Sequence, residues 1–268
     1  MGKQLLESVS FKLEIVKGIS ITGDVKTIRN QTAKPVLIIG HGFRGHKDWG
    51  FWPDMTSRFA EKGYYTVIFN FARIAAEELG LEELAKARAS TLSQELSDWG
   101  TVVAALFENR LPLAQTEADR SKLAILGHSR AGGTAIVYAA EHPEIRAAVI
   151  WNGGGSPNRP VAAEGEHLSA QEQAILHDLD ANAERFQIKQ KFGSLEIPAL
   201  VVQGDQDVDR LLQAHRELWE VAPNQSFVAI QGGNHTFGAV DPYQGATEAL
   251  DTAFQETDSF LRHALHWQ

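Results

Sequence analysis

Lys122–Gly133 reads KLAILGHSRAGG and places Ser129 between a strand-like and a helix-like run of residues. Lys122–Leu126 is aliphatic, as is typical of a buried parallel strand, and Thr134–Glu141 predicts a helix. A nucleophile elbow has this layout, because its tight turn strains the backbone of the serine and accepts only small neighbours. The usual pattern is G-x-S-x-G; here Ala131 takes the last position and a glycine follows. The alternative interpretation is an ordinary connection between a strand and a helix.

The composition limits the classes of protein to which the chain can belong. With 268 residues, 43 % of them hydrophobic, it is long enough for one large α/β domain, and we expect residues 1–268 to form that single domain. A formal net charge of −9 argues against a nucleic-acid partner, which requires clustered basic residues. The absence of cysteine excludes disulfides and thiolate metal sites.

The first residues, MGKQLLESVSFKLEIVKG, contain no apolar run of the kind found in a signal peptide. No segment of the chain approaches the roughly 18 apolar residues of a membrane span. These two features predict a soluble, cytoplasmic protein.

Strand-like and helix-like segments alternate along the chain, which predicts a mostly parallel sheet with helices on both faces. Val9–Val16 and Ile19–Ile28 alternate in polarity around Lys17-Gly18 and predict an antiparallel hairpin at a sheet edge. The other expected strands are Pro35–Ile39, Tyr64–Phe71, Lys122–Leu126, Ile145–Trp151, Ile197–Val202 and Ser226–Ile230. The expected helices are Asp54–Lys62, Ser93–Phe107, Thr134–Glu141, Arg210–Trp219 and one at about 245–265.

Two segments interrupt this alternation. Ala72–Ser90 is charged and rich in alanine, and we expect it to be helical. Asn152–Leu195 begins with three glycines, Gly153–Gly155, and continues into an amphipathic stretch. Loops of this length in a compact domain are commonly lids or binding segments, so we expect a lid over about 152–195 with the glycines as its hinge. The alternative is a surface excursion without a function.

A candidate general base follows the last expected strand. His235 stands in the glycine-rich loop GGNHTF, whereas His215, His263 and His266 lie on expected helices. A serine hydroxyl becomes a useful nucleophile when a nearby imidazole accepts its proton. His235 is therefore the candidate base for Ser129.

A candidate acid follows the preceding expected strand. The sequence VVQGDQD places Asp205 and Asp207 at the strand end, where either carboxylate can orient the imidazole. We favour Asp207, which lies deeper in the loop, and keep Asp205 as the alternative. Asp205, Asp207 and Asp209 also resemble the start of a calcium loop, but arginines at its sixth and twelfth positions exclude that site.

A candidate oxyanion hole follows the strand Pro35–Ile39. The loop GHGFRGH contains small residues that permit a sharp turn, and such a hole needs two backbone N–H donors. We expect these donors to be Phe43 and Arg130, the latter directly after Ser129. A metal site at His41, His46 and Asp48 is an alternative, but the spacing matches no ligand signature.

The order Ser129, Asp207, His235 is the order of nucleophile, acid and base that accompanies strand–turn–helix elbows. Together with HGFRGHKDWGFW, GHSRAGG and GGNHTF, it makes the chain, from about Val9 to Leu265, resemble the α/β-hydrolase fold superfamily. Within it the chain is similar to bacterial esterases related to dienelactone hydrolase and to the acyl-peptidase-like hydrolases. The resemblance implies a sheet of eight strands, the second antiparallel to the rest, with a cap inserted after strand six.

These residues predict a serine hydrolase that cleaves small-molecule carboxylic esters with short to medium acyl chains through an acyl-enzyme. The alternatives are a peptidase or amidase, a carbon–carbon bond hydrolase or haloperoxidase-like relative on the same triad, and a ligand-binding member of the fold without catalysis. No cofactor and no metal are expected; Gly153–Gly155 does not extend to G-x-G-x-x-G, because Asn158 takes the last position. No motif in the chain sets an oligomeric state.

An apolar acyl pocket has candidate walls among the aromatic residues near the expected strand ends. These are Phe43, Trp49, Trp52 and Trp151. The alternative interpretation is that two or more of them pack in the core beneath the lid.

Overall fold

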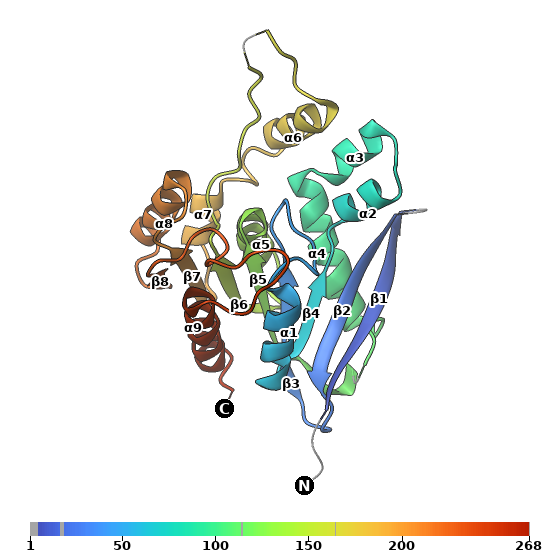
Figure 1. Ribbon diagram of the computed structural model, residues 1–268, viewed down its shortest axis with the longest axis vertical. Helices are drawn as coiled ribbons and strands as arrows, with labels where there is room; N and C mark the ends of the chain where they lie inside the picture. The colour runs from blue at the N-terminus through green and yellow to red at the C-terminus, as the bar shows by residue number, and fades with distance from the viewer. Residues whose placement is uncertain (1–4, 17–18, 114, 164, 268) are drawn as a thin grey trace.

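The computed structural model describes residues 5–16, 19–113, 115–163 and 165–267. Its strands form one eight-stranded sheet in the order β1-β2-β4-β3-β5-β6-β7-β8, with helices on both faces (Figure 1). The strands are β1 (Leu6–Val16), β2 (Ile19–Ile28), β3 (Lys34–Gly40), β4 (Tyr65–Phe69), β5 (Ala118–His128), β6 (Ile145–Trp151), β7 (Ala199–Gly204) and β8 (Ser226–Ile230). The helices are α1 (Trp52–Glu61), α2 (Ala72–Glu78), α3 (Glu83–Ala89), α4 (Leu92–Phe107), α5 (Arg130–Glu141), α6 (Ala170–Ala181), α7 (Ile188–Gly193), α8 (Asp209–Val221) and α9 (Glu248–Ala264), with a 3₁₀ turn at Gln115–Glu117.

The sheet confirms the expected architecture. β2 pairs antiparallel with β1 and with β4, whereas β4, β3, β5, β6, β7 and β8 run parallel. The expected turn Lys17-Gly18 lies outside the described residues. Every residue of β3, β4 and β7 is buried, as a parallel sheet covered on both faces requires. The carboxyl ends of the six parallel strands therefore share one edge, and the loops that follow them meet there.

Alternate residues of each central strand enter two separate cores, because successive side chains of a strand point to opposite faces. In β3, Val36 and Ile38 face the core beneath α4, α5 and α7. Leu37 and Ile39 face the core beneath α1 and α9. Each fully buried aliphatic side chain contributes about 1.5–3 kcal/mol, so the two cores hold the strand ends in a fixed register.

The two inserted segments contain helices, as expected. Residues 72–90 form α2 and α3, and the segment after β6 contains α6 and α7. α6 packs against α3 and α4, and the connection that leads to it extends beyond the body of the molecule (Figure 1). Asp178 of α6 accepts hydrogen bonds from the backbone N–H and hydroxyl of Ser93, in the first turn of α4. The segment thus lies over the carboxyl edge of the sheet. Among the described residues, no helix has the length and apolar character to span a membrane.

Candidate active site

Ser129 lies in a strained turn between β5 and α5. Its φ of 57° and ψ of −122° fall in a region that residues other than glycine rarely adopt. Glycines make this turn possible: a Cβ at Gly127 would lie 2.2 Å from the carbonyl oxygen of Ala131, and one at Gly153 would lie 2.3 Å from that of Ser129. α5 begins at Arg130, earlier than expected. Ala131 therefore has helical backbone, which explains why this position accepts alanine.

The structure brings the three candidate triad residues into one hydrogen-bonded chain. His235 Nε2 lies 2.9 Å from Ser129 Oγ, and His235 Nδ1 lies 2.9 Å from Asp207 Oδ2. The residues come from the ends of β5, β7 and β8, at the shared carboxyl edge. The side chain of His235 is 40 % exposed and that of Asp207 is 0 % exposed, so the imidazole is open to a ligand while the carboxylate is shielded.

Asp207, and not Asp205, contacts His235. Asp207 also accepts hydrogen bonds from Gln203 Nε2 at 3.0 Å and from the N–H of Val208 at 2.7 Å. Burial alone would raise the pKa of Asp207, but the hydrogen bond and charge of His235, with these two donors, hold it below its usual value. Asp205 is exposed and instead accepts the N–H of Gly232 at 2.8 Å, which ties together the loops after β7 and β8.

Two residues that the sequence analysis did not single out hold the backbone of His235. His128 Nε2 lies 2.9 Å from the carbonyl oxygen of His235, and Asn152 Nδ2 donates to the same oxygen at 2.9 Å. Asn152 Oδ1 accepts the N–H of Gly204 at 2.7 Å, so this buried amide also joins β6 to β7. Only their places in the sequence could have pointed to these two residues: His128 directly precedes Ser129, and Asn152 directly precedes Gly153–Gly155.

His128 acts as a neutral donor. Burial, followed by the neighbouring imidazole of His235, lowers the pKa of His128 to about 4. The ring is therefore uncharged at neutral pH, and the contact with a carbonyl oxygen places its single proton on Nε2.

The loop after β3 lies against the turn of Ser129. A Cβ at Gly42 would lie 3.1 Å from Ser129 Cβ and 3.0 Å from His128 Nδ1, so the chain can approach this closely only with glycine there. Phe43 follows Gly42, and its ring lies 4.4 Å from the guanidinium carbon of Arg130. The two candidate oxyanion donors, Phe43 and Arg130, thus come from two separate segments that meet beside Ser129.

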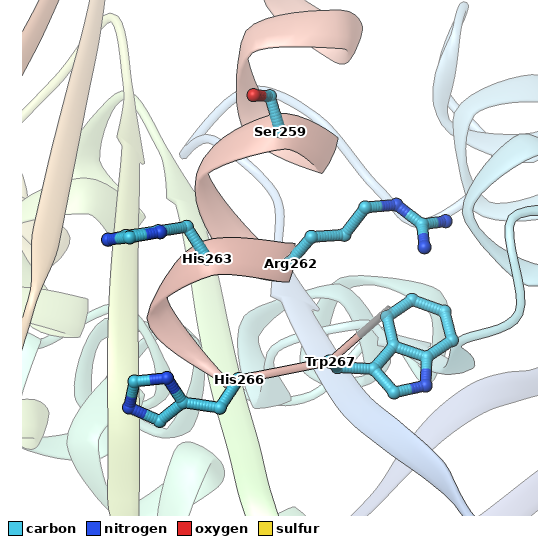
Figure 2. A pocket seen from close by; sticks show the side chains of 5 residues that line it. All are labelled: Ser259, Arg262, His263, His266 and Trp267. Atoms are coloured by element: carbon cyan, nitrogen blue, oxygen red, sulfur yellow. The ribbon is translucent and has the colours of Figure 1, made fainter.

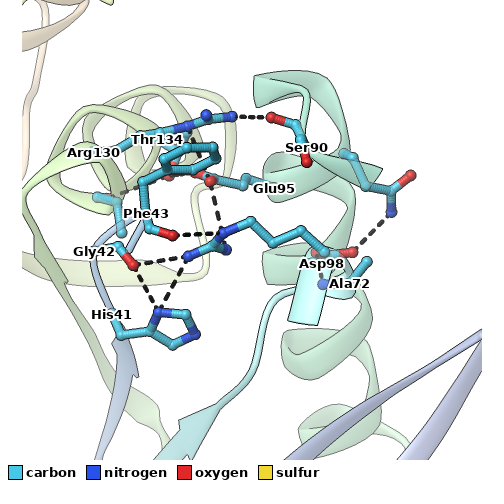
Figure 3. A network of polar contacts seen from close by, with 12 residues as sticks. His41, Gly42, Phe43, Ala72, Ser90, Glu95, Asp98, Arg130 and Thr134 are labelled. Atoms are coloured by element: carbon cyan, nitrogen blue, oxygen red, sulfur yellow. Dashed lines mark hydrogen bonds and ion pairs between the residues drawn. The ribbon is translucent and has the colours of Figure 1, made fainter. Parts of the chain in front are cut away.

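Arg130 has a buried partner that the sequence analysis did not identify. Its Nε lies 3.0 Å from Glu95 Oε1, and its Nη2 donates to the carbonyl oxygen of Ser90. The guanidinium therefore turns toward Ser90 and α4, as Figure 3 shows.

Two of the three candidate pocket tryptophans belong to the core. Trp52 and Trp151 are 1 % and 0 % exposed, stack with ring centroids 5.8 Å apart, and lie in the core beneath α1 and α9. The expectation that they wall an acyl pocket is therefore wrong, because their side chains point into the sheet's packed face. Trp49 is half-buried at the edge of that core and stays a pocket candidate.

His41, His46 and Asp48 do not come together as a metal site. His41 is buried and its Nδ1 faces Arg73 Nη2 at 3.3 Å; burial and the charge of Arg73 keep its pKa well below the usual range. Within the described ranges, no group of three or more His, Asp or Glu side chains is placed to hold a metal ion.

A surface hollow of about 580 Å³ lies at the C-terminal end of α9. Figure 2 shows its lining of Ser259, Arg262, His263, His266 and Trp267. Trp267 contacts Tyr64, just before β4, with ring centroids 5.0 Å apart. The hollow is therefore at the amino edge of the parallel strands, opposite the edge that carries Ser129.

The chain is similar to a family of protein sequences and to several solved structures. Residues 22–265 match the model of the dienelactone hydrolase family, and no curated protein sequence matches the chain. Est1E from Butyrivibrio proteoclasticus is 18 % identical with a TM-score of 0.69, over 96 % of this chain and 99 % of that one. The alpha/beta hydrolase GrgF from Penicillium sp. sh18 is 15 % identical with a TM-score of 0.63, over 97 % and 100 %.

A puromycin-hydrolyzing peptidase of Mycobacterium tuberculosis is 16 % identical with a TM-score of 0.65, over 99 % of this chain and 40 % of that one. At these identities the likeness concerns the fold. It confirms the α/β-hydrolase fold that the motifs around Ser129 and His235 imply.

Proposed function

The chain belongs to the dienelactone hydrolase family, and from that premise we propose that it is a serine hydrolase that cleaves small carboxylic esters. The observation that carries the proposal is the chain Asp207–His235–Ser129, with two contacts of 2.9 Å. A side chain that accepts a proton at Nε2 while donating from Nδ1 to a carboxylate is the arrangement that activates a serine hydroxyl.

The proposed reaction proceeds in two steps. Ser129 Oγ attacks the ester carbonyl carbon while His235 Nε2 takes its proton, and the backbone N–H groups of Phe43 and Arg130 stabilise the resulting oxyanion. His235 then returns the proton to the leaving alcohol. Water, deprotonated by the same imidazole, attacks the acyl-enzyme; His235 then returns this proton to Ser129 Oγ as the acid is released. Asp207 keeps the imidazole in the required tautomer and stabilises its cation.

The proposed substrates are esters with short to medium acyl chains. Phe43 is half-buried against Arg130, and Trp49 is half-buried against Phe51; both offer apolar surface to such a chain in this proposal. The segment 152–195 acts as the lid in this proposal. Its support is the place of α6: Gln171 Nε2 donates to Ser90 Oγ at 2.7 Å, and the carbonyl of Ser90 binds Arg130, the neighbour of Ser129.

A fluorophosphonate probe tests the proposal directly. The Ser129 oxygen forms a bond to phosphorus, fluoride leaves, and the proton passes to His235, so wild-type protein is labelled and Ser129→Ala is not. Turnover of p-nitrophenyl esters from acetate to octanoate should fall by about 10⁴-fold or more in Ser129→Ala. Ester turnover that survives in Ser129→Ala would overturn the proposal.

An aryl amide of the same acyl groups, assayed in parallel, separates the esterase from a peptidase or amidase. The likeness to a puromycin-hydrolyzing peptidase is the reason to include it. We expect ester turnover to exceed amide turnover; the reverse order, lost in Ser129→Ala, would assign the triad to amide hydrolysis instead. Labelling without turnover of either class would indicate a ligand-binding member of the fold.

A further inference from the structure

A buried arginine supports the loop that carries the candidate oxyanion donor. Arg73, in the first turn of α2, is only 4 % exposed. Its Nε donates to the carbonyl oxygen of Phe43 at 2.9 Å, and its Nη2 donates to that of Gly42 at 2.8 Å. One guanidinium thus binds two consecutive carbonyls of the loop, a use of the rigid fork of donors that lysine cannot reproduce.

The bond to Gly42 also sets the direction of the N–H of Phe43. The carbonyl of Gly42 and the N–H of Phe43 belong to one planar trans peptide, so they point in opposite directions. Arg73 and the N–H of Gly45, which donates to the same oxygen at 3.0 Å, hold this carbonyl, so the N–H of Phe43 points away from Arg73. Gly42 packs against Ser129, where an added Cβ would lie 3.1 Å from Ser129 Cβ.

Glu95 connects Arg73 with the second candidate donor. Glu95 is 1 % exposed in α4; its Oε1 lies 3.9 Å from Arg73 Nη1 and 3.0 Å from Arg130 Nε. The ring of Phe43 packs against both cations, 5.1 Å from the guanidinium carbon of Arg73 and 4.4 Å from that of Arg130. Figure 3 shows Phe43 and Glu95 beside Arg130 in this cluster. One carboxylate therefore holds both Arg73 and Arg130, the residue that follows Ser129.

Burial of the Arg73 cation costs free energy, because the guanidinium loses its contact with water. A buried cation is tolerated when a charged partner and hydrogen-bond acceptors compensate for the lost water, and here Glu95 and the two carbonyl oxygens surround Arg73. His41 Nδ1 lies 3.3 Å from Arg73 Nη2 and 2.8 Å from the carbonyl oxygen of Gly42. Every donor contact of Arg73 beyond its ion pair goes to the segment 41–43. The arginine is too deeply buried to reach a substrate, so its effect on chemistry passes through that segment.

We propose that Arg73 is a positioning residue: held by Glu95, it fixes the Gly42–Phe43 peptide so that the N–H of Phe43 faces the oxyanion formed at Ser129. The proposal rests on the serine hydrolase function proposed above. It assigns to Arg73 stabilisation of the transition state and no contact with the ground-state substrate.

The test is kinetic, on Arg73→Met, which keeps the length of the side chain and removes its donors and charge. We expect kcat for an ester to fall by about 10²-fold, the effect of losing one oxyanion donor, with KM within about twofold of wild type. The second-order rate of fluorophosphonate labelling should fall in parallel, because the phosphoryl oxygen of the adduct occupies the oxyanion position. Arg88→Met, an exposed arginine of α3, is the matched control and should retain wild-type kinetics.

Arg73→Lys keeps the cation opposite Glu95 but replaces the fork by a single donor centre. We expect it to fold and to lose about 10-fold in kcat at unchanged KM, which keeps the test decisive should Arg73→Met fail to fold. Unchanged kcat and labelling rate in either folded variant would overturn the positioning role, as would a loss confined to KM. Ester turnover of wild type and of Ser129→Ala is measured in the same assay. If Ser129→Ala keeps the wild-type turnover, the proposed hydrolase function is wrong, and the role of Arg73 is wrong with it.

Discussion

His128 Nε2 lies 2.9 Å from the backbone carbonyl oxygen of His235, so the residue before the candidate nucleophile holds the candidate base in place. Asn152 donates to the same oxygen. The loop after β8 is thereby anchored to the ends of β5 and β6, and the imidazole of His235 reaches Ser129 from a fixed backbone. The geometry of the site depends on these two buried donors as well as on the triad side chains.

The stability of the protein should therefore depend on the protonation of His128. Its pKa is lowered to about 4 from the ordinary value of 6.5 for histidine by burial and by His235. As the pH falls below about 6.5 the unfolded chain binds a proton at this residue, whereas the folded protein binds it only near pH 4. The His128 contribution to the unfolding free energy is thus fully present above pH 6.5 and is lost on acidification, at up to about 1.4 kcal/mol per pH unit and about 3 kcal/mol in total.

His128→Gln isolates this contribution, because its amide N–H can reach the carbonyl of His235 but does not titrate. Urea unfolding of both proteins from pH 7.5 to pH 4 should show wild type losing more stability than the variant between pH 6.5 and pH 4. Groups distant from His128 titrate equally in both proteins and cancel in the difference. Parallel curves would mean that His128 does not titrate as its burial predicts.

Asp207→Asn should lower kcat for esters by about 10⁴-fold, because an amide facing His235 Nδ1 favours the wrong tautomer of the imidazole. Asp205→Asn is the matched control: Asn retains the oxygen that accepts the N–H of Gly232, so its kcat should stay near that of wild type. Steady-state kinetics on one ester suffice for both variants. A larger loss in Asp205→Asn than in Asp207→Asn would reverse the assignment of the acid.

The sequence predicted the fold well because the relevant patterns are local. Continuous apolar runs and helical spacing indicate strands and helices without knowledge of their neighbours, and the element after Ser129 was misjudged only in where it begins. Asp207 and Asp205 remained alternatives because both follow the same strand end. The contact that separates them, from Gly232 to Asp205, joins residues 27 positions apart.

The residues that the sequence did not reveal act through longer separations. His128 and Asn152 meet His235 from 107 and 83 positions away, and Arg73 meets Phe43 across 30 positions. Trp151 was misassigned for a related reason. Its place at the end of β6 suggested the open edge of the sheet, but the register of the strand turns its ring into the core beneath α1 and α9.

Gly153→Ala should damage the site although Gly153 has no reactive group. The added Cβ would lie 2.3 Å from the carbonyl oxygen of Ser129 and 3.1 Å from its nitrogen, so the backbone of the turn must move. We expect a loss of about 1–3 kcal/mol in unfolding free energy and at least a 10-fold loss of kcat, since displacement of a nucleophile by about 1 Å is costly.

Gly100→Ala provides the comparison for Gly153→Ala. Gly100 lies within α4, and the nearest atom to an added Cβ is 3.9 Å away, on Tyr138. Alanine favours the helix over glycine by about 1 kcal/mol, so this variant should be at least as stable as wild type with unchanged kcat. Equal kcat for wild type and Gly153→Ala would show that the turn tolerates the extra carbon, contrary to the distances.

Trp151→Phe tests the assignment of Trp151 to the core. Trp151 Nε1 donates to Thr257 Oγ1 at 2.9 Å, and its ring stacks on Trp52. Removal of this hydrogen bond and of buried ring volume should lower the unfolding free energy by about 2 kcal/mol with KM unchanged across acyl chain lengths. Trp49→Phe should do the opposite, with little change in stability and a KM that rises for the longer esters. If Trp151→Phe instead altered chain-length preference without loss of stability, the side chain would line the acyl site after all.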